Sequence, residues 1–316
     1  MNLYNEFLDE WSEKWFQYIK DNPKKWWNYN KITENPNMTW KTIKNNPPII
    51  HWSFRYLSRN PNITWENVQD KEVWNTIVSY CVSDWDYYHL SKNPNITWKI
   101  IQEGHDVRWH YDLASLNPNI TWEIVQANPD MPWNYNYLSA NPNITWEIIC
   151  ANPTFPWNYN WLSKNPNITW EIVQANPDEP WSYYWLSVNP NITWEIVQAN
   201  PYKYWSYAKL CENPNITWEI ILANPDKFWD NLATSKNPNV TWEIVESTNR
   251  ELYPHIHWNY DNLSGNRMDK PREDFIRKKF QEWFKRSPLK EELMANVWHP
   301  RNFDKFKYLD SETFGD

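Results

Sequence analysis

Carboxylates recur in this sequence one residue after a repeated tryptophan. Paired carboxylates can hydrolyse glycosidic bonds when one is protonated and the other ionised, which requires two environments that push their pKa values apart. A row in which every carboxylate has the same neighbours lacks that difference. We therefore interpret the row as solvated acids in the first turn of short helices, where the helix dipole favours negative charge. The row contains Glu123, Glu147, Glu171, Glu195, Glu219 and Glu243.

Two histidine groups have side chains that could ligate a metal ion. His255 and His257 precede Asp261, and His105 precedes His110, but neither group has the supporting Cys or His spacing of a zinc site. The chain has only 3 Gly, all isolated, so a glycine-rich phosphate loop is excluded. No nucleophile elbow or Ser-His-Asp context is present. We expect no catalytic residues, no metal, no cofactor and no enzymatic activity.

Composition indicates which ligands and which cellular compartment to expect for the protein. The net charge of −8 disfavours general affinity for nucleic acid. The sequence has no apolar run long enough to cross a membrane, and its first twenty residues do not have the pattern of a signal peptide. Nine Asn-x-Thr acceptor sites begin with Asn37, but capping explains these residues and we expect no glycosylation. Three cysteines are expected to be reduced thiols in an intracellular protein.

A tandem repeat organises the sequence. The motif Asn-Pro-Asn-φ-Thr-Trp, where φ is apolar, recurs every 24 residues from Asn93 to Asn237. Two earlier units carry insertions, and a tenth unit fades out at Asn266. The nine motifs begin at Asn35, Asn60, Asn93, Asn117, Asn141, Asn165, Asn189, Asn213 and Asn237.

Each unit has two related halves, such as residues 117–127 and 128–140, with Trp five residues after Asn in both. Alternating apolar residues in the first half also allow a strand. We favour helices, because Thr121 suits an N-cap and Pro132 a first helical position. Trp133, Tyr137 and Leu138 would then share one helical face, and each Asn-Pro would end a helix.

The expected fold is an all-α solenoid of 24-residue repeats, each with two short helices and some 3₁₀ character. Such helices are unstable alone, so stacked indoles must hold them together. Ten units would form a rod of about 100 Å. We expect an N-terminal capping helix in residues 1–21, repeats over 22–266, and a C-terminal helical hairpin and tail in 267–316 as the second cap. The predicted ladder contains Trp98, Trp122, Trp133, Trp146, Trp157, Trp170, Trp181, Trp194, Trp205, Trp218, Trp229 and Trp242.

The repeated Asn-Pro-Asn-Ile-Thr-Trp-Glu-Ile-Val unit resembles the Trp-rich tandem repeats of uncharacterised proteins in giant DNA viruses. The segment 289–300 is similar to a C-terminal segment that several of these proteins share. The resemblance covers nearly the whole chain and implies a viral origin, with the protein in the host cytoplasm or the virion. It implies no activity.

Positions that vary between units indicate where a partner would bind, because variable positions of a solenoid line its binding surface. Drift on an unconstrained face is the alternative. We expect a noncatalytic scaffold for protein–protein interaction, directed at a host protein. The alternatives are a structural component of the particle, and a reader of single-stranded nucleic acid or glycan. The candidate partner-binding residues are Met131, Tyr137, Phe155, Trp161, Glu179, Trp185, Lys203, Lys209 and Lys227.

Overall fold

The computed structural model describes residues 3–46, 52–70, 85–104, 107–248 and 257–286. Throughout these ranges the regular structure is helical, without strands. The predicted all-α solenoid of short paired helices is thereby confirmed. None of the helices in these ranges is both long enough and apolar enough to span a membrane.

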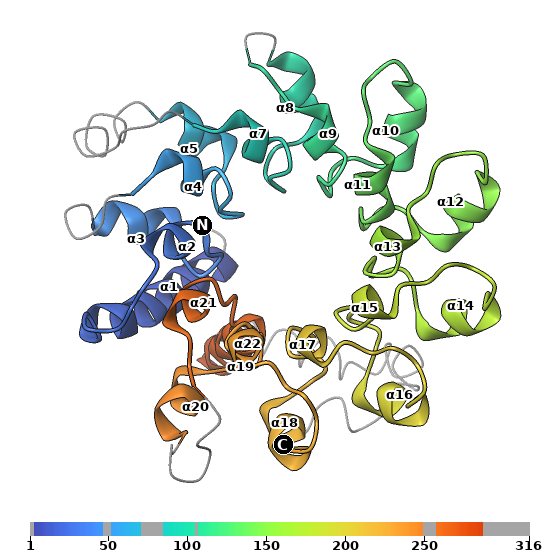
Figure 1. The fold of residues 1–316 in the computed structure, drawn as a ribbon. Coiled ribbons are helices and arrows are strands. Elements are labelled where there is room, and N and C mark those ends of the chain that lie inside the picture. Colours follow the sequence, from blue (N-terminus) through green and yellow to red (C-terminus); the bar gives the residue numbers. More distant parts are fainter. Residues whose placement is uncertain (1–2, 47–51, 71–84, 105–106, 249–256, 287–316) are drawn as a thin grey trace, which may run out of the picture.

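The short helices form two concentric sets (Figure 1). Each outer helix comes from the first half of a unit, and each inner helix from the second half. The outer helices are α3 (Trp40–Asn45), α5 (Trp65–Gln69), α8 (Trp98–Glu103), α10 (Trp122–Ala127), α12 (Trp146–Ala151), α14 (Trp170–Ala175), α16 (Trp194–Ala199), α18 (Trp218–Ala223) and α20 (Trp242–Ser247). The inner helices are α2 (Tyr29–Glu34), α4 (Phe54–Leu57), α7 (Tyr87–Leu90), α9 (Tyr111–Ala114), α11 (Tyr135–Ser139), α13 (Tyr159–Leu162), α15 (Tyr183–Leu186), α17 (Tyr207–Leu210), α19 (Asn231–Thr234) and α21 (Tyr260–Ser264).

Side-chain caps set where the helices begin. The Thr121 side chain accepts a hydrogen bond from the Ile124 amide and caps α10, as predicted. The inner helix begins later than predicted, because Asn134 is its N-cap and accepts from the Tyr137 amide. Pro132 and Trp133 therefore lie in the preceding turn, and the shared helical face predicted for Trp133 was wrong. The expected 3₁₀ character is limited to i→i−3 bonds at helix ends.

The first asparagine of each motif joins its own unit to the one before. The Oδ1 of Asn141 accepts from the Asn143 amide at 2.8 Å, which closes the Asn-Pro turn. Its Nδ2 donates to the carbonyls of Ser115 and Asn117, at 2.9 and 3.0 Å. Asn141 is fully buried, so the loss of this side chain would remove one donor from each of these carbonyls. The bond between units was not predicted from the sequence.

Indole rings pair across neighbouring units. The ring of Trp122, at the start of α10, has its centre 5.5 Å from that of Trp157, in the second half of the next unit. The same pairing joins Trp98 to Trp133, Trp146 to Trp181, Trp170 to Trp205 and Trp194 to Trp229, at 5.6–5.8 Å. Of the predicted ladder, Trp122, Trp133, Trp170, Trp181, Trp194, Trp205 and Trp218 are buried, and Trp98, Trp146, Trp157, Trp229 and Trp242 are partly buried.

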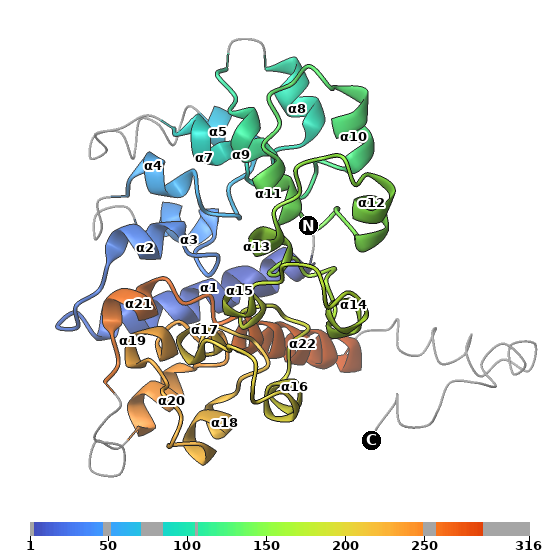
Figure 2. The same ribbon diagram turned by 45° about the vertical axis from the view of Figure 1, so that its right-hand side comes forward.

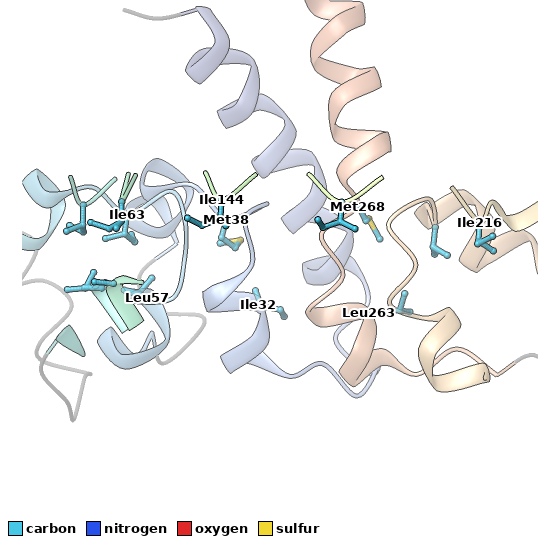
Figure 3. Close-up of a cluster of buried hydrophobic side chains, with 14 of the residues drawn as sticks. Ile32, Met38, Leu57, Ile63, Ile144, Ile216, Leu263 and Met268 are labelled. Atoms are coloured by element: carbon cyan, nitrogen blue, oxygen red, sulfur yellow. The ribbon is translucent and has the colours of Figure 1, made fainter. Parts of the chain in front are cut away.

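Two circumferential rows of aliphatic side chains make the rest of the core (Figure 3). One row comes from the apolar residue before each Thr cap and includes Met38, Ile63, Ile144 and Ile216, all fully buried. The other row comes from the inner helices and includes Ile32, Leu57 and Leu263. The first row continues through Val240 and Met268, whereas α19 contributes no residue to the second row, because buried Thr234 stands in place of the leucine.

The two ends of the repeat array meet and close a ring (Figure 1). The Asn28 amide donates to Ser264 Oγ at 2.9 Å, and Asn35 Nδ2 donates to the carbonyls of Ser264 and Asn266, each at 2.9 Å. Consecutive units are joined by the same bonds. The expected rod was therefore wrong, because each unit turns slightly relative to the last and ten units return to the start.

Both chain ends build the tenth unit. Residues 22–34 are a second half, since Trp27 Nε1 donates to the Asn22 carbonyl at 2.8 Å just as Trp133 Nε1 does to Asn128. The first half begins at Asn266. In place of one short outer helix, this unit has α1 (Leu3–Asp21), which leads into residues 22–34, and α22 (Asp269–Arg286), which follows Asn266.

Helices α1 and α22 pack on each other at the seam (Figure 2). The ring centres of Phe7 and Phe280 lie 5.0 Å apart, and those of Trp11 and Phe275 lie 5.5 Å apart, so the two helices are antiparallel. The predicted terminal helices thus exist, but they fill the seam of a ring rather than cover two separate ends. The second helix of the predicted hairpin, within 289–297, lies outside the described residues.

Candidate interaction surfaces

Four of the nine predicted partner-binding residues occupy one position on successive inner helices. They are Tyr137, Trp161, Trp185 and Lys209, on α11, α13, α15 and α17. The rings of Tyr137 and Trp161 meet edge to face at 5.2 Å. All four side chains are half-buried, so the position forms a continuous row. We call this row, together with Lys164, the inner row.

Lysines in the inner row stack on its indoles. The Lys164 ammonium lies 3.6 Å from the ring centre of Trp161 and 5.2 Å from that of Trp185. The Lys209 ammonium lies 5.5 Å from the ring centre of Trp185 and pairs with Glu212 at 3.2 Å. Burial and the nearby charge of Lys209 lower the pKa of Lys164. The cations of this row are thus engaged by groups of the chain itself.

The other five predicted residues share a position in the turn before each inner helix, and three of them contact the tyrosine of the preceding inner helix. Phe155 stacks on Tyr135 at 5.1 Å, and the Lys203 ammonium lies 5.0 Å from the ring centre of Tyr183. Burial, together with a hydrogen bond to Glu179, raises the pKa of Tyr159. Met131 packs against the core, and Lys227 pairs with Asp226 at 2.8 Å. These side chains thus lie at junctions between units.

Four aromatic side chains that the sequence reasoning did not select are almost wholly exposed. Tyr202, Tyr204, Phe228 and Trp26 are exposed by 96, 92, 91 and 89%. Three of them, Tyr204, Phe228 and Trp26, stand directly before the second-half tryptophan of their units. We call these four residues the exposed patch.

A comparison between units could have revealed the exposed patch. The position directly before the second-half tryptophan is proline in three successive units, as Pro132, Pro156 and Pro180. Further round the ring the same position carries Tyr204, Phe228, His257 and then Trp26. The arc with Pro132, Pro156 and Pro180 thus differs at this position from the arc with Tyr204, Phe228 and Trp26, and the units between Trp26 and Pro132 carry His51, Asp84 and Arg108 there.

Lysines accompany the exposed patch. Lys203 and Lys227 directly precede Tyr204 and Phe228, and Lys24 and Lys25 precede Trp26. Asp226 pairs with Lys227, but Lys24, Lys25 and Lys203 are exposed. The patch is therefore locally basic on a chain whose net charge is −8, a distribution that favours acidic ligands.

The glutamate row has uniform electrostatics. Hydrogen bonds from the Thr121 and Thr145 hydroxyls lower the pKa values of Glu123 and Glu147. The same contact lowers the pKa values of Glu171, Glu195 and Glu219. All five shift in the same direction for the same reason, so these five carboxyls do not divide into an acid and a base.

The histidines considered as metal ligands are only partly described. His255 and His105 lie outside the described residues, while His257 and His110 lie within them. In the part of the chain that the structure covers, no three His, Cys, Asp or Glu side chains are grouped closely enough to hold a metal ion.

No model of a known protein family matches this chain, and neither curated proteins nor solved structures gave a match.

Proposed function

We propose that this ring is a noncatalytic scaffold that binds a protein partner through the exposed patch. The supporting observation is the near-complete exposure of Trp26, Tyr202, Tyr204 and Phe228, whereas the next most exposed aromatic side chain among the described residues, Tyr184, is 48% exposed. Large aromatic side chains dominate the energetics of protein interfaces. Water contact with four such rings is unfavourable, and a partner's apolar surface would remove it.

The chemistry of the patch defines the partner segment. The lysines beside the rings favour acidic side chains at the edge of the interface, and the rings favour apolar or aromatic anchors at its centre. The partner segment is therefore acidic with apolar anchors. The resemblance to giant-virus repeat proteins makes a host protein the candidate source of this segment.

A direct test is selection from a displayed peptide library on the immobilised ring. We expect enrichment of acidic peptides with aromatic or aliphatic anchors. Their binding should be lost in the double variant Tyr204→Ala/Phe228→Ala and kept in Pro132→Ala/Pro156→Ala, which alters the same repeat position on the other arc. Enrichment without this difference between variants would place the binding surface elsewhere, and no enrichment would contradict the proposal.

Single-stranded nucleic acid is a second candidate, favoured by the adjacent lysine and aromatic residues at 203–204, 227–228 and 25–26. Such proteins stack bases on aromatic rings beside a basic groove. The net charge of −8 weighs against it. Binding of an oligo-dT strand, measured by fluorescence anisotropy, would replace the protein hypothesis if it weakened with salt and was lost in the same double variant.

The first alternative expected from the sequence, a structural component of the particle, assumed a stiff rod that spans distance. The closed ring removes that argument.

A further inference from the structure

A pocket on the inner side of the seam has mostly basic side chains. Its volume is about 410 Å³, and it lies between α2, α4, α7 and the turn after α21. The charged and titratable side chains that line it are Lys31, Glu34, Arg59, His89, Lys92 and Arg267. Four are permanently basic and one is acidic, which is unusual on a chain of net charge −8.

Part of this positive charge has no partner among the residues that the structure describes. Arg59 pairs with Glu34 at 3.2 Å, Lys31 with Asp261, and Arg267 with Asp269 at 3.0 Å. Lys92 belongs to none of the ion pairs among the described residues. Glu34 is the carboxylate that acts on the pKa of Lys92, and it is already paired with Arg59. The buried Nε–H of Arg59 also lacks a hydrogen-bond partner, although buried donors are normally paired.

The pKa of Lys92 reflects the same excess of positive charge in the pocket. Burial, followed by repulsion from Arg59, lowers the pKa of Lys92. An anion in the pocket would raise the pKa of Lys92 again, because it would compensate both the lost hydration of the ammonium and the positive charge of Arg59.

We propose that this pocket binds a phosphate group, with Lys92, Arg59 and Lys31 as its main ligands. A dianionic phosphate has several acceptor oxygens, which suit a guanidinium fork and two ammonium groups better than a single carboxylate does. Glu34, already paired with Arg59, orients the guanidinium. The site goes beyond the proposed protein-binding function and does not depend on it.

Ring closure assembles the site. Lys31 lies in the first inner helix, and Arg267 follows the last one, 236 residues later in numbering. Arg59 and Lys92 come from the next two units. Because Gly265 and Arg267 line the same pocket from the other side of the seam, a phosphate bound here stabilises the closed form, since any ligand that binds only one state stabilises that state.

Thermal unfolding and isothermal titration with pyrophosphate, at ionic strength matched with sodium chloride, test the proposal. We expect pyrophosphate to raise Tm and to bind wild-type protein. Lys92→Met should weaken binding about tenfold or more, the usual effect of removing one charge-assisted contact. Lys236→Met is the matched control, because Lys236 has the same repeat position outside the pocket, and it should bind like wild type.

Arg59→Lys provides a second variant that keeps the charge and removes the fork; it should also weaken binding. A Tm shift reproduced by chloride alone, or equal binding by Lys92→Met and wild type, would overturn the proposal. A phosphoserine peptide and its unphosphorylated form then separate the two sources of phosphate. Tighter binding of the phosphopeptide than of pyrophosphate assigns the site to a modified side chain, and the reverse assigns it to a free polyphosphate.

Discussion

Asn35 donates a hydrogen bond of 2.9 Å from its side-chain amide to the carbonyl of Asn266, which lies 231 residues further along the chain. The same bond joins Asn141 to Asn117 and Asn165 to Asn141, where the residues are 24 apart. The seam therefore uses the same hydrogen bonds as the interfaces between consecutive units.

The equivalence of the interfaces predicts equal effects of substitution. Asn35→Ala and Asn165→Ala should each lower the free energy of unfolding by about 1–3 kcal/mol, because each removes hydrogen-bond donors from buried carbonyls of the neighbouring unit. Urea denaturation measures both. If Asn35→Ala were nearly neutral while Asn165→Ala was destabilising, the ends would not be joined in solution.

The indole ladder predicts a contrast between two tryptophans. Trp170 is 8% exposed and packs on Trp205 at 5.8 Å, whereas Trp26 is 89% exposed. Trp170→Ala should destabilise by about 3–5 kcal/mol, the usual cost of a large-to-small core change. Trp26→Ala should change stability by less than about 0.5 kcal/mol. Similar midpoints of chemical unfolding for the two variants would contradict the packing described.

The glutamate row predicts a local effect of pH. The Thr169 hydroxyl lowers the pKa of Glu171 from its usual value of 4.5. A lowered folded-state pKa contributes stability above the unfolded pKa, and this contribution is lost as pH falls through the folded value. In carbon-detected NMR titrations, Glu171 should titrate below 4.5 in wild type and closer to 4.5 in Thr169→Ala. An unchanged titration in the variant would show that the hydroxyl is not the cause.

Cys211 predicts a stabilising substitution. Most other inner helices carry serine at this position, and Ser187 Oγ donates to the Tyr183 carbonyl at 2.7 Å and accepts from the Ser206 amide at 2.9 Å. Cys211 is fully buried, and its thiol is a weaker partner for both contacts. Cys211→Ser should therefore stabilise by about 0.5–1.5 kcal/mol. A lower melting temperature would show that the sulfur fills space that oxygen cannot.

The repeat period and helix type follow from local chemistry, which is why sequence reasoning reached them. Thr121 and the Asn-Pro pairs act within a few residues of themselves, so the pattern in one unit predicts its caps and turns. The helix start predicted at Pro132 was wrong, because proline suits a turn as well as a first helical position. The start of the inner helix was decided instead by Asn134.

Ring closure depends on the small rotation between units, which no local motif encodes. The half unit at 22–34 was the available signal, because Asn22 and Trp27 have the Asn-to-Trp spacing of every other half. Of the candidate site residues, the inner row shares one position because the repeat is regular. The exposed patch was missed because the variable positions selected from the repeat did not include the one directly before the second-half tryptophan, where Tyr204 and Phe228 stand in place of proline.

The division of the tenth unit between the two chain ends has a consequence for synthesis. A nascent chain carries residues 22–34 from the start, but their neighbour across the seam emerges only when the ribosome has passed Asn266. Until then the edge formed by Asn28 and Asn35 displays unmatched amides. A chain truncated before Asn266 keeps that edge unpaired. It therefore forms an open, aggregation-prone arc whose exposed amides would distinguish it from the closed ring during protein quality control.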